Sequence, residues 1–424
     1  MHRSRSNDGE FSRWRSWVTS HAISERPTGF GEVLPEGETQ RWRRLPALQQ
    51  PEWEDAGAAA DAVRELSRRP PLVAVEEIRT LGYLLAEVAE GLLHVVQAGD
   101  CAEDPLECQP EHVIRKTALL DALAGVMSLN SLRPVLQVGR MAGQFGKPRS
   151  SSTEVVGGVE LPVYRGHLVN SPEADPELRR PDPRRLLSGH DAAATAMDAL
   201  RSRSVRSLSP VDAPVWTSHE ALVLDYELPQ LRRDEEGRLF LTSTHWPWIG
   251  DRTRQLDGAH VDLLATVANP VACKVGPSMD RDGLLALCER LDPDRTPGRL
   301  TLISRMGADR VAERLPGFVR AVREAGHPVI WMCDPMHGNT FSSPDGFKTR
   351  LVTTVVREVE EFQKAVTEAG GTAGGLHLET TPDEVSECVH DASLLERVGD
   401  KYTSLCDPRL NPGQALEVAS AWHM

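Results

Sequence analysis

The chain has 424 residues, of which 48 are Lys or Arg and 62 are Asp or Glu, so its formal charge is −14. This acidic balance disfavours a general nucleic-acid binder or a binder of anionic membranes. Hydrophobic residues make up 40% and charged residues 26%, values typical of a globular protein with a buried core. The length suits two ordinary domains or one large α/β barrel with insertions.

The sequence carries no sign of a membrane or an oxidising compartment. No apolar run approaches the roughly 20 residues that span a bilayer, and the N-terminus lacks the apolar stretch of a secretory signal. The seven cysteines are dispersed and never form a CxxC pair, which argues against a disulfide scaffold and a zinc ribbon. We therefore expect a soluble, cytoplasmic protein with reduced thiols that binds neither nucleic acid nor membranes.

Residues 1–45 form a predicted N-terminal tail that precedes a single catalytic unit at 46–424. The tail is rich in Arg, acids, Pro and Gly, and contains one short amphipathic stretch with Phe11, Trp14 and Val18 at helical spacing. It is interpreted either as a segment that docks on the body or on a neighbouring subunit, or as a disordered leader.

From about residue 54, amphipathic helical segments alternate with short apolar runs, a pattern typical of repeated β-α units. The clearest helical periods cover 55–69, 75–91, 111–127, 310–326 and 347–370. The predicted strands are 92–97, 134–139, 205–209, 238–244, 271–276, 300–304, 328–333 and 375–379. Eight such strands predict an α/β protein with a (β/α)8 (TIM) barrel. After the second strand, the polar segment 146–190 is too long for an ordinary connection and predicts a functional loop or lid.

The active site of such a barrel lies at the carboxyl ends of the strands, so the residues after each apolar run are the candidates. Cys101, His337, Glu379 and Asp407 each lie at the end of a predicted strand or in a loop beyond it, where a closed barrel would bring them together. A mixed sulfur, nitrogen and oxygen donor set suits Mn²⁺, Co²⁺, Fe²⁺ or Zn²⁺ better than Ca²⁺. Because a lone Cys or His is more often structural, residue types alone leave the metal site open.

A second group at the strand ends is cationic and lies beside Gly or Ser. Its members are Arg140, Lys147, Arg149, Arg252, Lys274 and Arg305. Guanidinium groups bind phosphate or carboxylate through paired hydrogen bonds, so this group favours phosphorylated small molecules as substrates. The alternative is that most of these cations form solvated ion pairs.

At these residues the chain resembles the type II 3-deoxy-D-arabino-heptulosonate 7-phosphate (DAHP) synthases. The resemblance covers about residues 42–424. It rests on the motifs GDCAE, GRMAGQFGKPRS, WIGDRTRQLDGAHVDLLATVANP, KVGP, RLTLISRMG, HPVIWMCDPMHGNT, GFKTR, GGLHLE and CDPRLNP. It implies a metal-dependent barrel enzyme that condenses phosphoenolpyruvate with erythrose 4-phosphate and water. The products would be DAHP and phosphate, in the first step of the shikimate pathway that leads to aromatic amino acids.

The resemblance also implies residue roles. The metal ligands would be Cys101, His337, Glu379 and Asp407, holding Mn²⁺ or Co²⁺. Phosphoenolpyruvate would contact Arg140, Lys274 and Arg305, and erythrose 4-phosphate would contact Lys147, Arg149, Ser150 and Arg252, with Trp248 as a wall between the substrates. The residues expected to act in catalysis are Lys274, Arg140, Asp251 and His337. The proton for the developing alkoxide would come from Lys274 or from a metal-bound water. The family is usually oligomeric, which implies a homodimer or larger.

Two departures from the family pattern bear on function. Asp251 stands where the family usually has Glu, which implies weaker activity or a different aldose, such as an amino-sugar analogue (an aminoDAHP synthase). The chain is also short between residues 200 and 218, where longer relatives carry a helical pair used in feedback. We therefore expect a short form with little inhibition by Trp, Phe or Tyr, serving a secondary-metabolite route.

Other functions remain open at this point. A metal-dependent hydrolase or isomerase would gather the same metal donors, but has no evident use for so many cations. A catalytically weak or silent paralogue with a regulatory or binding role has no evident reason to keep the whole set. Cys101 and Cys406 could form a redox-active disulfide, although two unpaired thiols suit a reducing cytosol better.

Overall fold

The structure, a computed structural model, describes residues 31–206 and 214–423, so the stretch with Phe11, Trp14 and Val18 lies outside the described residues. Eight parallel strands form the central sheet, in the order β6-β3-β2-β15-β12-β11-β10-β9. In chain order they are β2 (His94–Gly99), β3 (Val135–Arg140), β6 (Val215–Thr217), β9 (Trp248–Ile249), β10 (Val271–Val275), β11 (Leu300–Ser304), β12 (Ile330–Cys333) and β15 (Thr372–Glu379).

The two edges of this sheet meet, so the sheet closes on itself. Beyond β6, Glu220 forms a parallel bridge with Trp248 of β9. The Trp248 N–H donates to the His219 carbonyl at 3.1 Å, and the Ala221 N–H donates to the Trp248 carbonyl at 3.0 Å. The predicted barrel is therefore confirmed, with its last seam made by a loop bridge instead of a full strand pair.

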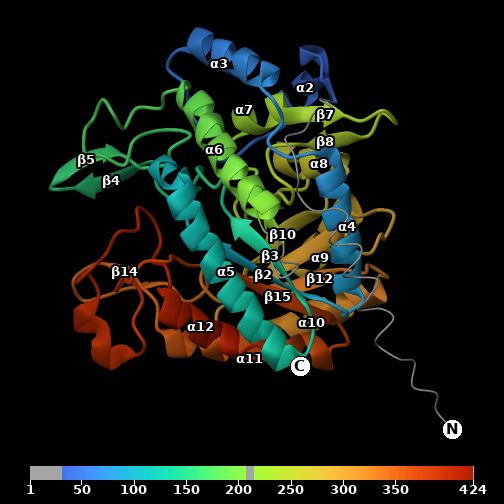
Figure 1. The fold of residues 1–424 in the computed structure, drawn as a ribbon, viewed down its shortest axis with the longest axis vertical. Coiled ribbons are helices and arrows are strands. Elements are labelled where there is room, and N and C mark those ends of the chain that lie inside the picture. The colour runs from blue at the N-terminus through green and yellow to red at the C-terminus, as the bar shows by residue number, and fades with distance from the viewer. Residues whose placement is uncertain (1–30, 207–213, 424) are drawn as a thin grey trace.

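Helices surround the barrel (Figure 1). They are α4 (Val75–Ala89), α5 (Pro110–Ser131), α6 (Arg185–Arg206), α8 (Ala259–Thr266), α9 (Arg281–Leu291), α10 (Val311–Glu324), α11 (Val352–Glu368) and α12 (Pro412–Ser420). Helix α5 packs against α6 on one side and α12 on the other (Figure 1). Two of them begin with side-chain caps: at α9 the Asp280 side chain accepts from the Gly283 N–H, and at α12 Asn411 and Gln414 form a capping box. No helix of the described residues is both long and apolar enough to cross a membrane.

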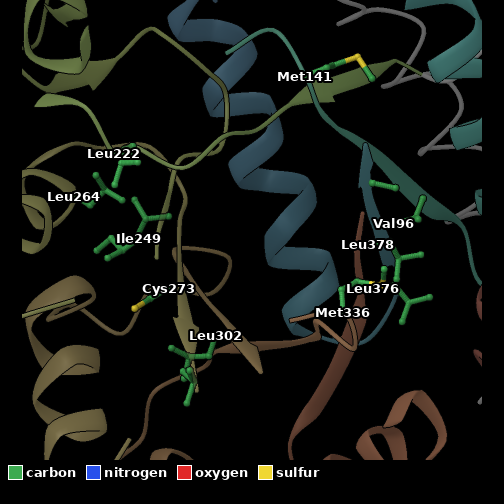
Figure 2. Close-up of a cluster of buried hydrophobic side chains, with 14 of the residues drawn as sticks. Val96, Met141, Leu222, Ile249, Leu264, Cys273, Leu302, Met336, Leu376 and Leu378 are labelled. Atoms are coloured by element: carbon green, nitrogen blue, oxygen red, sulfur yellow. The ribbon is translucent and has the colours of Figure 1, made fainter. Parts of the chain in front are cut away.

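Alternating strand residues face two apolar layers, because successive side chains of a strand point to opposite faces. One layer fills the barrel interior, with Val95, Val138 and Ile303 among its members. The other lies between the strands and the helices and includes Val96 and Leu302, shown with further members in Figure 2. The packed interior closes the barrel below the strand ends, which leaves those ends for the site.

Smaller elements decorate the barrel. Near the N-terminus, β1 (Glu32–Val33) pairs with β7 (Leu231–Arg233), which also pairs with β8 (Leu239–Leu241), and all these pairs are antiparallel. Further helices are α2 (Glu36–Arg43), α3 (Ala56–Arg68) and α7 (Leu224–Glu227), with 3-10 turns at Pro105–Cys108, Leu228–Gln230 and Ala392–Arg397. Two hairpins stand at the strand ends: β4 (Thr153–Val156) with β5 (Val159–Pro162), and β13 (Phe341–Ser342) with β14 (Lys348–Thr349).

Two predicted strands were wrong. Residues 205 and 206 belong to helix α6, while 207–209 lie outside the described residues, and the third barrel strand is β6 instead. The run 238–244 contains β8 of the antiparallel sheet, and the fourth barrel strand is β9. Strands of three and two residues are too short to show a hydrophobic period, which explains both errors.

Two other boundaries also differ from the prediction. The segment 146–190 contains the β4–β5 hairpin and the first turns of α6. Helix α11 begins at Val352 and not at 347, because residues 348–349 form β14.

Candidate active site

A cavity of about 420 Å³ opens at the carboxyl ends of the barrel strands. Among the predicted site residues, those that line it are Cys101, Arg140, Lys147, Arg149, Ser150, Trp248, Asp251, Arg252, Lys274, Arg305, His337 and Asp407. Glu379 is fully buried directly beside the cavity, in contact with His337. The structure therefore brings all the predicted site residues into one place.

Three of the predicted metal ligands form a compact cluster. Cys101, Glu379 and Asp407 each offer one donor atom, and these atoms lie within 4.8 Å of one another. They come from the end of β2, the end of β15 and the loop before α12. One thiol and two carboxylates at this separation can ligate a single divalent ion.

His337 is the fourth predicted ligand and is oriented toward the cluster. Its Nε2 atom lies 3.1 Å from Glu379 Oε1. Its other ring nitrogen, Nδ1, lies 2.8 Å from Asp334 Oδ2, a fully buried carboxylate. A carboxylate that holds one ring nitrogen and leaves the other facing the donors is the usual outer-shell arrangement of a metal-binding histidine. The donor set thus fits a divalent metal.

Lys147 joins the donor cluster to the cationic side of the cavity. Its Nζ atom lies 2.5 Å from Cys101 Sγ and 2.7 Å from Asp407 Oδ2. Burial opposes its charge, but the carboxylates and the thiol around it hold the pKa of Lys147 well above its usual range. The ammonium is therefore charged and is held against two predicted metal ligands, as well as facing the cavity.

Trp248 forms the floor beneath two predicted phosphoenolpyruvate contacts. The Arg140 guanidinium lies 5.4 Å from the Trp248 ring centroid, and Lys274 Nζ lies 5.9 Å from it. Both are cation–π distances. Lys274 also donates to Asp334 Oδ2 at 2.9 Å. The aromatic floor and the carboxylate fix the lysine in one position.

A polar chain inside the barrel fixes Arg140. Its NH1 group contacts His377 Nε2 at 2.6 Å, and His377 Nδ1 contacts Gln97 Oε1 at 2.6 Å. Because arginine can only donate, His377 Nε2 must accept, so the ring proton sits on Nδ1. Burial, with the charges of Lys274 and Arg140, holds the pKa of His377 well below its usual range, in agreement with a neutral ring.

Asp251 orients the third predicted phosphoenolpyruvate contact. Its Oδ2 accepts from Arg305 NH1 at 2.9 Å, and its Oδ1 accepts from Arg254 Nε at 2.8 Å. Although burial opposes ionisation, the hydrogen bond from Arg254 and the charge of Arg305 lower the pKa of Asp251. The carboxylate packs on Gly276, where an added Cβ would lie 2.6 Å from Oδ2. Asp251 therefore acts on the site through Arg305.

Three of the four predicted erythrose 4-phosphate contacts lie at the outer side of the cavity, whereas Lys147 is buried beside the donor cluster. Arg252 NH2 donates to Ser150 Oγ at 2.8 Å, and Arg149 NH2 donates to Glu154 Oε2 at 3.0 Å. Glu154 belongs to the β4–β5 hairpin, so the long segment after β3 supplies both a predicted anion-binding group and its counter-ion. The role of this segment as a lid stays a prediction.

Several polar residues that line the cavity were not predicted from the sequence. They include Gln144, Glu154, Glu220, Thr340 and Lys348. Glu220 is the most unusual, since its Oε1 is buried without a hydrogen-bond partner among the described residues. Burial raises the pKa of Glu220, with Lys274 and Lys147 opposing the rise. It lies three residues beyond the end of β6, so the strand-end rule would have found it had the third strand been placed correctly.

Cys101 and Cys406 are both thiols here and share a hydrogen bond. Burial, with this hydrogen bond and the charge of Glu379, raises the pKa of Cys101 well above its usual range. The same hydrogen bond lowers the pKa of Cys406. Two unpaired thiols stay the favoured interpretation, with a redox-active disulfide as the alternative.

Comparison with known proteins identifies the family. The model of the class-II DAHP synthetase family matches residues 37–214 and 205–422. The chain belongs to this family. The predicted family is thereby confirmed on most of the chain. The two matched segments meet within 205–214, where the sequence predicts a missing segment.

Individual relatives carry the same kind of name. The chain is 57% identical over 384 residues to a probable phospho-2-dehydro-3-deoxyheptonate aldolase from Pseudomonas fluorescens, covering 90% of this chain and 96% of that one. It is 38% identical to a phospho-2-dehydro-3-deoxyheptonate aldolase from Streptomyces coelicolor over 426 aligned positions, covering 89% and 95%. A solved aldolase of the same name from Francisella tularensis shares the fold at a TM-score of 0.52 and 13% identity, covering 88% and 99%.

Proposed function

We propose that this cavity condenses phosphoenolpyruvate with erythrose 4-phosphate and water to give DAHP and phosphate. Membership of the class-II family gives the reaction. We infer the location of the reaction from one observation: a Cys/His/Glu/Asp donor cluster and two groups of cations lie together at a single cavity at the strand ends. A metal-dependent hydrolase would account for the donors but not for the cations.

The cations bind and orient the two anionic substrates. Arg140, Lys274 and Arg305 neutralise the phosphate and carboxylate of phosphoenolpyruvate, which lies on Trp248. Lys147, Arg149, Ser150 and Arg252 bind erythrose 4-phosphate, chiefly through its phosphate. Fixed guanidinium groups neutralise charge without donating a proton to the nucleophilic methylene, because arginine stays protonated in proteins.

Cys101, His337, Glu379 and Asp407 are the residues that would hold a divalent ion, for which we propose Mn²⁺ or Co²⁺. When bound, such an ion supplies Lewis-acid polarisation of the aldehyde oxygen. Burial lowers the pKa of Lys274, which makes its ammonium a better proton donor than a free lysine. We assign to Lys274 the proton that the aldehyde oxygen takes up as the carbon–carbon bond forms.

The test is consumption of phosphoenolpyruvate by chelator-treated protein, with and without erythrose 4-phosphate, before and after addition of Mn²⁺ or Co²⁺. We expect consumption only when aldose and metal are both present. Cys101→Ala removes a donor and should abolish it, whereas Cys288→Ala, a buried cysteine of α9, should retain it. Consumption without the aldose, or full activity of Cys101→Ala, would contradict the proposal. Parallel assays with amino-sugar phosphates test whether the enzyme prefers a different aldose, as Asp251 in place of the usual Glu implies.

A further inference from the structure

Two buried arginines lie behind the donor cluster and outside the cavity lining. Arg350, between β14 and α11, is fully buried, and Arg409 lies in the loop that follows Asp407. We propose that Arg350 and Arg409 are positioning residues that hold the four metal-ligand segments in one arrangement. The inference rests on the metal site proposed above and concerns how the chain builds it.

Arg350 contacts three of the four segments at once. Its NH2 donates to Glu379 Oε2 at 2.8 Å, and its Nε donates to Thr340 Oγ1 at 2.8 Å. Its NH1 donates to the carbonyl of Pro408. These partners belong to the end of β15, the His337 loop and the Asp407 loop. A planar guanidinium has donors in fixed directions, so it fixes the relative positions of three partners.

Arg409 connects the fourth segment. Its NH1 donates to Asp100 Oδ1 at 2.9 Å, and Asp100 directly precedes Cys101. Its NH2 and Nε donate to Glu387 at 2.9 and 3.2 Å. The Asp407 loop is thereby tied to the Cys101 segment, more than 300 residues away in the chain.

Glu387 makes this connection rigid, because it organises the whole loop that carries Asp407. The buried carboxylate accepts the backbone N–H groups of Thr403, Ser404 and Arg409, at 3.0, 2.7 and 2.7 Å. Because three backbone N–H groups of the loop donate to one buried carboxylate, the loop is held in one conformation and the position of Asp407 is fixed. Arg409 donates to the same carboxylate and to Asp100, so it fixes Asp100 relative to this loop.

A purely electrostatic role makes the opposite prediction for metal binding. A cation beside Glu379 repels a divalent ion, so if Arg350 acted only through its charge, removing that charge would tighten metal binding. If it acts by positioning, both Arg350→Lys and Arg350→Met weaken binding, because neither side chain can reach three partners. The lysine variant keeps the charge and so separates the two roles.

The experiment measures Mn²⁺ affinity of the chelator-treated full chain by the electron paramagnetic resonance of free Mn²⁺. It also records the thiolate-to-metal absorption of the Co²⁺ form, which reports Cys101 directly. We expect a dissociation constant raised roughly 10- to 100-fold in Arg350→Lys and Arg409→Lys, as is typical when outer-shell partners of a metal site are changed. The thiolate-to-metal absorption of the Co²⁺ form should change in the same variants.

Arg232→Lys is the matched control. Arg232 is also buried, but its guanidinium donates to the carbonyls of Pro229, Leu231, Ser67 and Arg69, away from the site. It should lose thermal stability and keep the wild-type Mn²⁺ affinity. Arg409→Lys provides a second test should Arg350→Lys fail to fold, as judged by near-ultraviolet circular dichroism.

Two kinds of failure are distinguishable. Wild-type affinity in both folded lysine variants, or tighter binding by Arg350→Met alone, would overturn the positioning role and leave the metal site intact. A wild-type chain that binds neither ion, or a Co²⁺ thiolate absorption that persists in Cys101→Ala, would remove the metal site and the inference together.

Discussion

At the scale of single residues, several cavity cations have counter-ions supplied by the protein itself. Lys274 pairs with Asp334, Arg305 with Asp251, and Arg149 with Glu154. A buried or half-buried charge without a partner is costly, so each carboxylate both stabilises its cation and fixes where it points. Substrate affinity should therefore depend on the carboxylates as well as on the cations.

Replacing Asp251 with Asn is the direct test of this dependence. The amide keeps the shape but loses the charge that holds Arg305 and Arg254. A hydrogen bond to a charged group contributes about 1.5–3 kcal/mol, so kcat/KM for phosphoenolpyruvate should fall roughly 10- to 100-fold. Asp251→Glu keeps the charge and has the residue that the family pattern usually shows, so it should retain more activity. Unchanged steady-state kinetics in Asp251→Asn would contradict this role.

The charge state of Lys274 should set the alkaline limit of phosphoenolpyruvate binding. Burial lowers the pKa of Lys274 below its usual range, although Asp334 opposes the shift. A lysine with a lowered pKa loses its charge at lower pH, so binding should weaken at lower pH than for an exposed lysine. Calorimetric titration of phosphoenolpyruvate across alkaline pH measures this limit. In Lys274→Arg the limit should move to higher pH, because guanidinium stays charged; coincident limits would argue against Lys274.

At the scale of elements, the sequence predicts those strands that are long enough to show a pattern. The run 300–304 is β11 without any change of boundary, and five other barrel strands lie within two or three residues of prediction. The hydrophobic run 238–244 gives no information about its partner, and only the tertiary structure places it antiparallel to β7. Cys101, His337 and Glu379 were found because they lie at or just beyond the ends of long strands, whereas Glu220 was missed because it follows the three-residue β6.

The short connection between α6 and β6 predicts weak feedback inhibition by aromatic amino acids. Helix α6 ends at Arg206 and β6 begins at Val215, and the family match is split at the same place. The Streptomyces alignment spans 426 positions while covering 89% of the 424-residue chain, so that relative has residues with no counterpart here. We expect Trp, Phe and Tyr to inhibit weakly or not at all, as suits a secondary-metabolite route. Half-inhibition by any of them at submillimolar concentration in a steady-state assay would contradict this expectation.

At the scale of the whole molecule, barrel closure is what turns distant segments into one site. The eight parallel strands end at one rim. There Cys101, from the first third of the chain, lies close to Asp407, from the loop that precedes α12. Helix α12 packs on α5 and α11, which anchors the C-terminal segment that carries Asp407. The site therefore exists only in the closed barrel, and the unfolded chain has no equivalent of it.

A ligand that binds the native state and not the unfolded chain raises stability, by about 2.7 kcal/mol at a free concentration of 100 times its dissociation constant. Mn²⁺ or Co²⁺ should therefore raise the thermal midpoint of the chelator-treated protein, as measured by calorimetry at matched protein concentration. Cys101→Ala should lose most of this rise. Cys288→Ala leaves a cavity in the α9 core, so it should lower the midpoint of both forms and keep the difference between them. Equal midpoints with and without metal in the wild-type chain would show that the donors at the barrel rim do not form a metal site.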